Sequence, residues 1–258
     1  MTVAKLRALV RRSPVLWPLM RAARVTAAHF AFRGEFERFR RLSALLPAPL
    51  RLEWRERQAE LGDNTRLTRF DRHYVFHTAW AARIIAAQRP NVHVDISSSL
   101  YFVGIASAFV PIFFFDYRPA RLGLSNLVSG QASLLALPFR AGSLGSISCL
   151  HVVEHIGLGR YGDALDPAGD VKAIAELKRV LAPGGNLLFV TPVGAPKVRF
   201  NAHRIYAFQQ IVEAFAGLSL KQFALVPDDP RQDLLLDASP ALANQQGYGC
   251  GCFWFQRP

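Results

Sequence analysis

Apolar and polar positions between 145 and 190 follow the two periods that distinguish strands from helices. Small and apolar residues alternate over 145–150, as in a buried strand. Apolar residues then recur at helical spacing from 171 to 181, a Pro-Gly-Gly sequence at 183–185 ends that helix, and an apolar run over 187–190 predicts a second strand. A strand, a helix and a strand in this order predict a right-handed crossover between parallel strands.

The same periods elsewhere in the chain predict further elements of an α/β sheet. Asp71 is placed to cap a helix over 73–88, which Pro90 ends. The other predicted elements are a helix over 100–109, a loop leading into a helix over 201–216, and strands over 92–96, 111–116, 127–132, 218–226 and 251–256. The expected fold class is α/β, with a doubly wound, mostly parallel sheet.

By composition, the chain divides into a basic leader and a body. Its 258 residues, 51% of them hydrophobic, suffice for one α/β domain with an extension. The sequence Pro-Ala-Pro at 47–49 marks a hinge, and we predict a helical leader and linker over 1–70 and one domain over 71–258. Residues 1–60 hold 13 Lys and Arg against 5 Glu, a balance of +8 within the chain's +12. The basic excess therefore belongs to the leader.

Two uses of the leader fit this charge. Residues 1–46 predict one or two helices in which apolar residues lie among the cations, so the leader could rest on an anionic membrane surface. The alternative is a solvated arm that packs on the domain or on a second subunit. Nucleic acid is not an expected partner, because no reading motif accompanies the charge.

Neither a membrane span nor secretion is predicted. The longest apolar stretch, 101–115, contains Pro111 and is too short to cross a bilayer. The apolar patch near the amino terminus is interrupted by Pro14 and Pro18 and lacks a cleavage site, so we expect no signal peptide. Three cysteines cannot all pair, which favours a reducing compartment. The expected location is the cytoplasm, with the leader able to hold the protein at the inner face of a membrane.

Polar residues end the predicted strands at the edge where open α/β sheets bind ligands. An adenosine cofactor needs a tight turn after the first strand, a carboxylate after the second and a pocket for adenine. Asp95 lies at the end of the first predicted strand, Asp116 ends the second, and Gln131 and Ala132 end the third. Asp95 can serve either to contact the cofactor or to order its own turn through backbone bonds.

With these features the chain resembles the class I S-adenosylmethionine-dependent methyltransferases. The resemblance covers about residues 71–258 and rests on the segments 94–96, 116, 132–139, 153–155 and 177–185. It implies a Rossmann-like fold and S-adenosylmethionine as cofactor. The cofactor contacts that it implies come from residues after the first three strands, namely Asp95, Ser97, Ser99, Asp116, Gln131 and Ala132.

Within that class, four phrases resemble an uncharacterised bacterial domain family that is often associated with surface-polysaccharide biosynthesis. These phrases span residues 71–74, 77–80, 149–163 and 200–206. The resemblance implies a saccharide or related polar acceptor.

The first turn departs from the pattern of the class. Glycines usually follow the first acid, because they permit positive φ values and let the backbone approach the cofactor. Here Ser97 and Ser99 occupy those positions. Their hydroxyls can bond the cofactor, or the change can mark the loss of cofactor binding. A nicotinamide dehydrogenase is disfavoured, because the turn lacks the glycine fingerprint of that class.

Candidate catalytic residues follow the fourth strand. His151 lies nearest the strand end and is the predicted general base, because an acceptor hydroxyl must lose a proton as it receives the methyl group. Glu154 and His155 are the further candidates, although such residues can instead cap a helix or bind backbone. The predicted acceptor-binding residues, which precede a helix and could equally cap it, are Asn201, His203 and Arg204.

A metal site is not predicted from the sequence. His73 and His77 stand four residues apart on a predicted helix, a spacing that can chelate a metal ion. No acidic partner follows on the same helical face within the next turn. We therefore expect the two histidines to line the cofactor pocket or the core.

The function expected from these observations is transfer of a methyl group from S-adenosylmethionine to an oxygen atom of a saccharide or related polar acceptor. The alternative, favoured by Ser97 and Ser99, is a noncatalytic methyltransferase-like scaffold whose leader anchors an assembly at a membrane or a partner.

Overall fold

The computed structural model describes residue 13, residues 16–48 and residues 50–258. The chain forms two compact units, Met1–Arg69 and Phe70–Pro258. The first cations of the predicted leader lie outside the described residues, as do the proline at 14 and the last proline of the predicted hinge. No helix among the described residues is long and apolar enough to cross a membrane.

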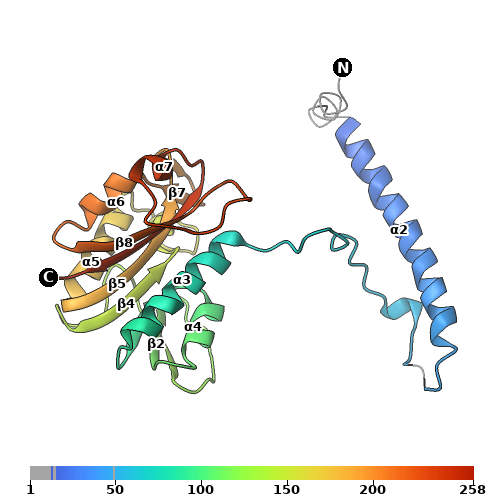
Figure 1. Cartoon of the computed structure of the whole chain (residues 1–258), viewed down its shortest axis with the longest axis horizontal. Helices are drawn as coiled ribbons and strands as arrows, with labels where there is room; N and C mark the ends of the chain where they lie inside the picture. The colour runs from blue at the N-terminus through green and yellow to red at the C-terminus, as the bar shows by residue number, and fades with distance from the viewer. Residues whose placement is uncertain (1–12, 14–15, 49) are drawn as a thin grey trace. The chain divides into compact units, whose positions relative to one another are not determined.

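The first unit contains one long helix, α2 (Leu16–Ser43), and a short 3-10 helix, η1 (Trp54–Glu56) (Figure 1). Pro18 does not interrupt α2, because it falls in the first turn, where backbone N–H groups have no helical partner. Trp54 packs edge-on against Phe36 at 4.9 Å, with the guanidinium of Arg57 4.3 Å from its ring centre.

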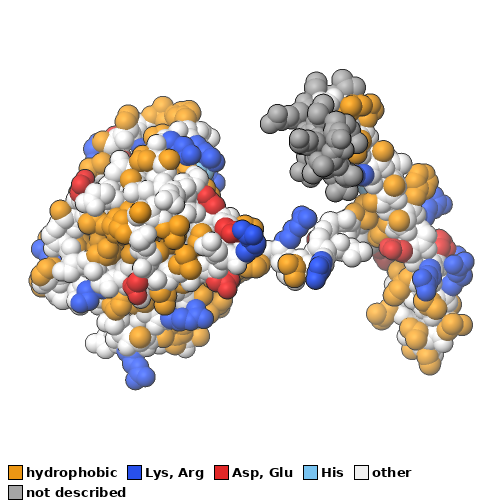
Figure 2. All heavy atoms as spheres, turned by 45° about the horizontal axis from the view of Figure 1, so that its top comes forward, with side chains coloured by type: hydrophobic (Ala, Val, Ile, Leu, Met, Phe, Trp, Pro, Cys, Tyr) orange, Lys and Arg blue, Asp and Glu red, His pale blue; other side chains and the backbone are white. Residues whose placement is uncertain are grey.

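Apolar side chains of α2 are exposed along its whole length. Figure 2 shows them interspersed with basic side chains on this unit. The large exposed ones are Leu16, Trp17, Leu19, Met20, Val25, Phe30, Phe39 and Leu42. At 100° per residue these positions spread around the helix, so α2 does not have the single apolar stripe of a surface helix.

The second unit is built on one eight-stranded sheet with the strand order β3-β2-β1-β4-β5-β10-β8-β9. β1 to β5 pair in parallel, and β10 inserts antiparallel between β5 and β8. The strands are β1 (His93–Ile96), β2 (Ile112–Asp116), β3 (Leu127–Gln131), β4 (Leu144–Leu150), β5 (Leu181–Val193), β8 (Ser219–Val226), β9 (Leu235–Leu236) and β10 (Gly249–Gln256).

Helices cover both faces of this sheet, which makes the fold doubly wound as predicted (Figure 1). On one face, α3 (Arg72–Gln88) and α4 (Leu100–Ala106) pack on one set of buried strand residues. On the other, α5 (Gly169–Val180) and α6 (Phe208–Ala214) pack on the alternate set, including the aromatic side chains of β5, β8 and β10. Alternation along each strand thus supplies two separate cores.

Most predicted elements are present, with differences where loops were expected. Asp71 caps α3 as predicted, accepting a hydrogen bond from Tyr74 N at 3.2 Å. The expected loop over 201–216 contains part of a hairpin, β6 (Lys197–Arg199) and β7 (His203–Ile205), before α6. A short 3-10 helix, η2 (Val153–His155), and a short helix, α7 (Pro240–Asn244), were not predicted, because three to five residues give too little periodicity to detect.

Candidate active site at the carboxyl edge of the sheet

The turn after β1 uses the backbone conformation that glycine favours. Ser97 has φ 57°, and its N–H donates to Phe115 O at 2.8 Å. A left-handed conformation costs a residue with a side chain about 1 kcal/mol or more. Ser99 has an ordinary φ of −64° at the start of α4. Only the first of the two serines therefore occupies a position that needs glycine-like freedom.

Asp95 orders this turn. Its side chain is fully buried, its Oδ1 accepts from Ser98 N at 3.0 Å, and its Oδ2 accepts from the Ser148 hydroxyl. Leu150 N in turn donates to Ser98 Oγ at 3.0 Å. Burial raises the pKa of Asp95 to about 6. Of the two predicted roles, this geometry supports the ordering of the turn, because both carboxylate oxygens are bonded within the protein.

A buried histidine extends this polar chain behind the turn. His93 Nδ1 lies 2.7 Å from Ser146 Oγ, and its Nε2 lies 2.8 Å from Ser148 Oγ. Burial lowers the pKa of His93 to about 3, so the ring is neutral at pH 7. This series of hydrogen bonds was not predicted, although the alternation of side chains along the strands indicates it. His93 and Asp95 share one face of β1, and Ser146 and Ser148 share the same face of the neighbouring β4.

A cavity of about 190 Å³ lies at the ends of β1, β2 and β4. Its lining brings together the predicted Ser97, Asp116, His151 and His155. One oxygen of Asp116, Oδ1, accepts from Arg118 N at 2.7 Å, which leaves Oδ2 outside that bond.

The two residues predicted to contact adenine lie beside the Asp116 turn instead. The amide of Gln131 donates to Tyr117 O at 3.3 Å, and Ala132 N donates to Asp116 O at 3.1 Å. Neither residue lines the 190 Å³ cavity.

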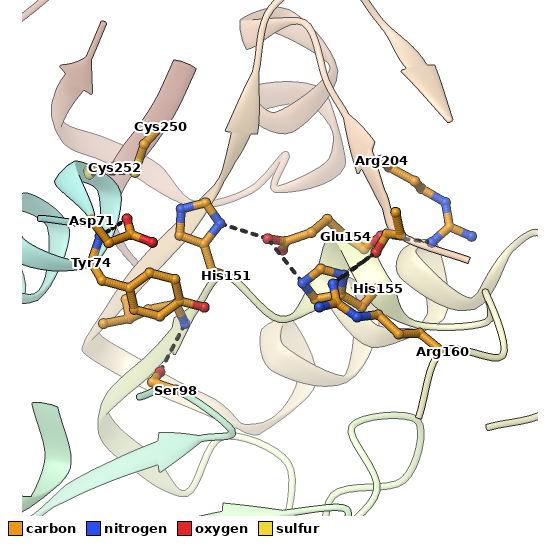
Figure 3. A network of polar contacts seen from close by, with 12 residues as sticks. Asp71, Tyr74, Ser98, His151, Glu154, His155, Arg160, Arg204, Cys250 and Cys252 are labelled. Atoms are coloured by element: carbon orange, nitrogen blue, oxygen red, sulfur yellow. Dashed lines mark hydrogen bonds and ion pairs between the residues drawn. The ribbon is translucent and has the colours of Figure 1, made fainter. Parts of the chain in front are cut away.

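His151 and Glu154 form a buried pair at the end of β4 (Figure 3). The backbone of His151 has φ 59°, and its ring Nδ1 lies 2.7 Å from Glu154 Oε1. Burial works to raise the pKa of Glu154, but the adjacent His151 holds it below its ordinary value. In the described part of the chain, neither His151 Nε2 nor Glu154 Oε2 has a hydrogen-bond partner. Glu154 therefore fixes the orientation of the His151 imidazole and leaves its Nε2 without a partner among the described residues.

His155 approaches the same carboxylate from the other side. Its Nε2 is 3.8 Å from Glu154 Oε1, and its Nδ1 donates to Ala202 O at 2.5 Å. The three predicted catalytic residues are thus brought together, with Glu154 between two imidazoles (Figure 3).

A second cavity, of about 290 Å³, adjoins the first. Both cavities are lined by His151, His155 and Tyr161. The other lining residues of the second are Asp71, Arg72, His73, Tyr74, Glu154, Arg160 and Tyr248. Burial lowers the pKa of His73 to about 4 and raises that of Tyr248 to about 12, so both are neutral at pH 7. The second cavity thus combines imidazole and phenol groups with two acidic residues, Asp71 and Glu154, and two basic ones, Arg72 and Arg160.

The three predicted acceptor-binding residues do not form one group in the structure. Arg204 is buried, and its guanidinium donates to Ile156 O at 2.7 Å and Pro167 O at 3.3 Å and lies 3.4 Å from Asp170 Oδ2. These contacts hold the guanidinium within the protein and support a structural role for Arg204.

The other two predicted acceptor residues also occupy distinct places. Asn201 is exposed in the β6–β7 turn with φ 59°, a conformation that asparagine tolerates better than most residues. His203 lies beside the second cavity, with its ring 4.7 Å from that of Tyr248. Burial lowers the pKa of His203.

Comparison with known proteins gives one family match and many structural matches. A family model described as "Caenorhabditis protein of unknown function, DUF268" matches residues 140–232. No curated protein matches the chain significantly. The solved structures that it resembles include the N-methyltransferase NodS of Bradyrhizobium japonicum, in complex with S-adenosyl-L-homocysteine. That match has 15% identity and a TM-score of 0.50, covering 87% of this chain and 97% of NodS.

A second structure with the same score is a putative sarcosine dimethylglycine methyltransferase from Galdieria sulphuraria. It is 14% identical to this chain, with a TM-score of 0.50, and the match covers 70% of this chain and 84% of that one. Together with the strand order, these matches show that the body of the chain has the Rossmann-like fold of the class I methyltransferases.

Proposed function

We propose that this protein is an S-adenosylmethionine-dependent methyltransferase that methylates an oxygen atom of a saccharide or related polar acceptor in the cytoplasm. The observation that carries the proposal is the position of His151. Its unpartnered Nε2 is held by the bond to Glu154, and the residue lines both cavities at the carboxyl edge of the sheet. A base that lines both cavities is within reach of ligands in either one.

Cofactor binding is supported by the first cavity. Ser97 and Asp116 lie there together, after the two strands that hold an adenosine cofactor in Rossmann-like folds. Its 190 Å³ is below the roughly 300–1,000 Å³ of ordinary ligand pockets. Tyr161 borders both cavities from a loop and is 38% exposed, so its movement would give a bound cofactor more room.

The chemistry expected of these residues is proton removal during an in-line displacement. S-adenosylmethionine supplies an electrophilic methyl group on sulfur. His151 Nε2 would accept the proton of the acceptor hydroxyl as the oxygen forms its bond to the methyl carbon. Glu154 would stabilise the resulting imidazolium and hold the ring orientation, since its Oε1 already accepts from Nδ1. The cavity walls would align donor and acceptor, which contributes by proximity.

A polyhydroxylated acceptor is supported by the lining of the second cavity. Imidazole and phenol groups, such as His73, Tyr74 and Tyr248, both donate and accept hydrogen bonds, as sugar hydroxyls do. The resemblance of the sequence to a family associated with surface polysaccharides points to the same class of acceptor.

Asp116→Ala tests the cofactor site. We expect it to weaken S-adenosylmethionine binding about 5- to 150-fold, corresponding to the roughly 1–3 kcal/mol of a charge-assisted hydrogen bond to a ribose hydroxyl. Titration calorimetry on the full chain measures this, with circular dichroism to confirm folding. Asp63→Ala, at an exposed acid of the first unit, is the matched control. Equal affinities of Asp116→Ala and the unchanged protein would contradict the assignment.

The noncatalytic scaffold remains the second candidate because Ser97 holds a conformation that ordinarily selects glycine. The same calorimetry separates the two candidates. If the folded, unchanged protein showed no binding of S-adenosylmethionine at millimolar concentration, the scaffold would be favoured over the enzyme.

We further propose that the basic first unit attaches the protein to an anionic membrane surface. The support is the +8 balance of residues 1–60 together with the exposed apolar side chains of α2. Full-length protein is expected to sediment with vesicles containing phosphatidylserine at low salt and to be released as salt screens the charges.

Charge variants of the full chain test this attachment. The triple variant Arg24→Gln, Arg38→Gln and Arg41→Gln should reduce sedimentation, whereas three exposed arginines of the second unit serve as the control (Arg83, Arg121 and Arg140, each to Gln). Equal losses in both triple variants, or sedimentation insensitive to salt, would reject a specific role for the first unit.

A further inference from the structure

Three metal-binding side chains from distant segments converge beside the His151–Glu154 pair. His73 comes from the first turn of α3, His151 from the end of β4, and Cys250 from β10. One ligand atom from each lies within 4.8 Å of the other two. Among the described residues, this is the group of His, Cys, Asp and Glu side chains whose spacing fits a metal ion.

His151 is held in the form that a metal ion requires. Its Nδ1–H donates to Glu154 Oε1, so the lone pair of Nε2 is available. That Nε2 atom is buried and has no partner in the described part of the chain. A histidine orientated by a carboxylate through one nitrogen, with the other nitrogen free, is the usual arrangement behind a metal ligand. In Figure 3 the free nitrogen points away from Glu154, toward the side on which Cys250 lies.

The donor set indicates which ion would bind. Cys250 is fully buried on the α3 side of the sheet, with its Sγ 3.9 Å from that of Cys252. Two imidazole nitrogens and one sulfur are the ligands that zinc prefers, whereas magnesium and calcium prefer oxygen. Tetrahedral zinc ligands stand about 3.5 Å apart, so zinc binding would draw the three donors together. It would also rotate the ring of His73, which now stacks on that of His151 with ring centroids 5.4 Å apart.

We propose that His73, His151 and Cys250 bind one zinc ion, with the fourth coordination position open to the second cavity. His73 and His151 both line that cavity, which gives the open position access to solvent or a ligand. His77, the other histidine of the α3 pair, is not one of the three ligands. The sequence expectation of no metal site considered only this pair, whereas two of the proposed ligands come from other segments.

The site goes beyond the proposed methyl transfer and does not depend on it. His151 Nε2 cannot bind an ion and accept a proton at the same time. Zinc would therefore create a second state of the protein in which the proposed base is blocked. Metal binding can be measured on the protein alone, so failure of the zinc proposal and failure of the methyltransferase proposal are separate results.

Cobalt and zinc titrations of the chelator-treated, full-length protein test the site. We expect one Co²⁺ per chain with a thiolate-to-cobalt charge-transfer band in the near ultraviolet, and displacement of that cobalt by one equivalent of Zn²⁺. Cys250→Ser should abolish the band, and His73→Ala should weaken zinc binding in calorimetry by at least about tenfold. His73 is only partly buried, so its variant is the less disruptive of the two.

Cys252→Ser is the matched control, because Cys252 is equally buried two residues along β10 but is not one of the three ligands. It should keep both the band and the affinity. The proposal would be overturned if the unchanged protein bound neither ion. It would also be overturned if folded Cys250→Ser and His73→Ala proteins bound zinc as the unchanged protein does, or if Cys252→Ser alone lost the band.

Discussion

Replacing His151 with Gln is expected to lower kcat for methyl transfer by about 10²- to 10⁴-fold, the range that a general base contributes. The amide can occupy part of the ring's space but cannot accept a proton at neutral pH. The measurement is release of S-adenosylhomocysteine in the presence of sugars, uronic acids and nucleotide sugars, using the acceptor that the unchanged protein methylates fastest. Affinity for S-adenosylmethionine should change little by comparison.

Two neighbouring variants make this result specific. Glu154→Gln should give a smaller loss, since it weakens the stabilisation of the imidazolium but leaves the base in place. His155→Gln is the matched histidine control, because its ring faces the same Glu154 oxygen at 3.8 Å while its Nδ1 is bonded to Ala202 O. A larger loss in His155→Gln than in His151→Gln would assign the base to His155 instead.

The Asp95→Asn protein is expected to gain stability relative to the unchanged protein as the pH rises from about 4 to 7. The folded pKa of Asp95 is raised by burial from 3.8 to about 6. Its contribution to stability is therefore fully present below about pH 3.8 and is lost as the pH rises through about 6. The shift corresponds to about 3 kcal/mol at pH 7. The asparagine has no charged form and lacks this loss.

Urea unfolding at pH 4, 5, 6 and 7 measures the difference in free energy between the two proteins. The two proteins must be compared with each other, because histidines with lowered pKa values change the stability with pH in the opposite direction. The depressed pKa values of His73 and His93 make their contribution fall as the pH drops below about 6.5, in both proteins. Asp63→Asn, at an exposed acid, controls for the general change in charge. If the difference in unfolding free energy between the unchanged and Asp95→Asn proteins did not vary with pH, ionisation of Asp95 would not destabilise the fold.

The helices and strands of the body could be predicted from the sequence because each element carries its own period. The buried alternation over 145–150 and the helical spacing after 171 are local signals, and β4 and α5 follow them closely. The ends of the strands were located in the same way, which brought Asp116 and His151 to one edge of the sheet.

Features that depend on contacts between distant segments could not be predicted. The role of Arg204 comes from backbone carbonyls 37 to 48 residues away, and nothing near it in the chain indicates them. The convergence of Cys250 with His73 and His151 needs the antiparallel insertion of β10, a topological fact that periodicity does not contain. Ser97, in contrast, could be identified from the sequence, because it stands where a glycine usually follows the first acid. Its positive φ is the conformation that such a glycine would adopt.

The way in which Arg204 holds the segment after β4 has a consequence for how such proteins diversify. Arg204 contacts that segment through the carbonyl groups of Ile156 and Pro167. Carbonyl groups are present whatever the side chains are, so these two contacts of Arg204 do not depend on which side chains the intervening loop carries. Tyr161 and Arg160, which face the cavities from that loop, can thus be exchanged during evolution while the loop keeps its position. A related chain could accept a different ligand by changing these side chains alone.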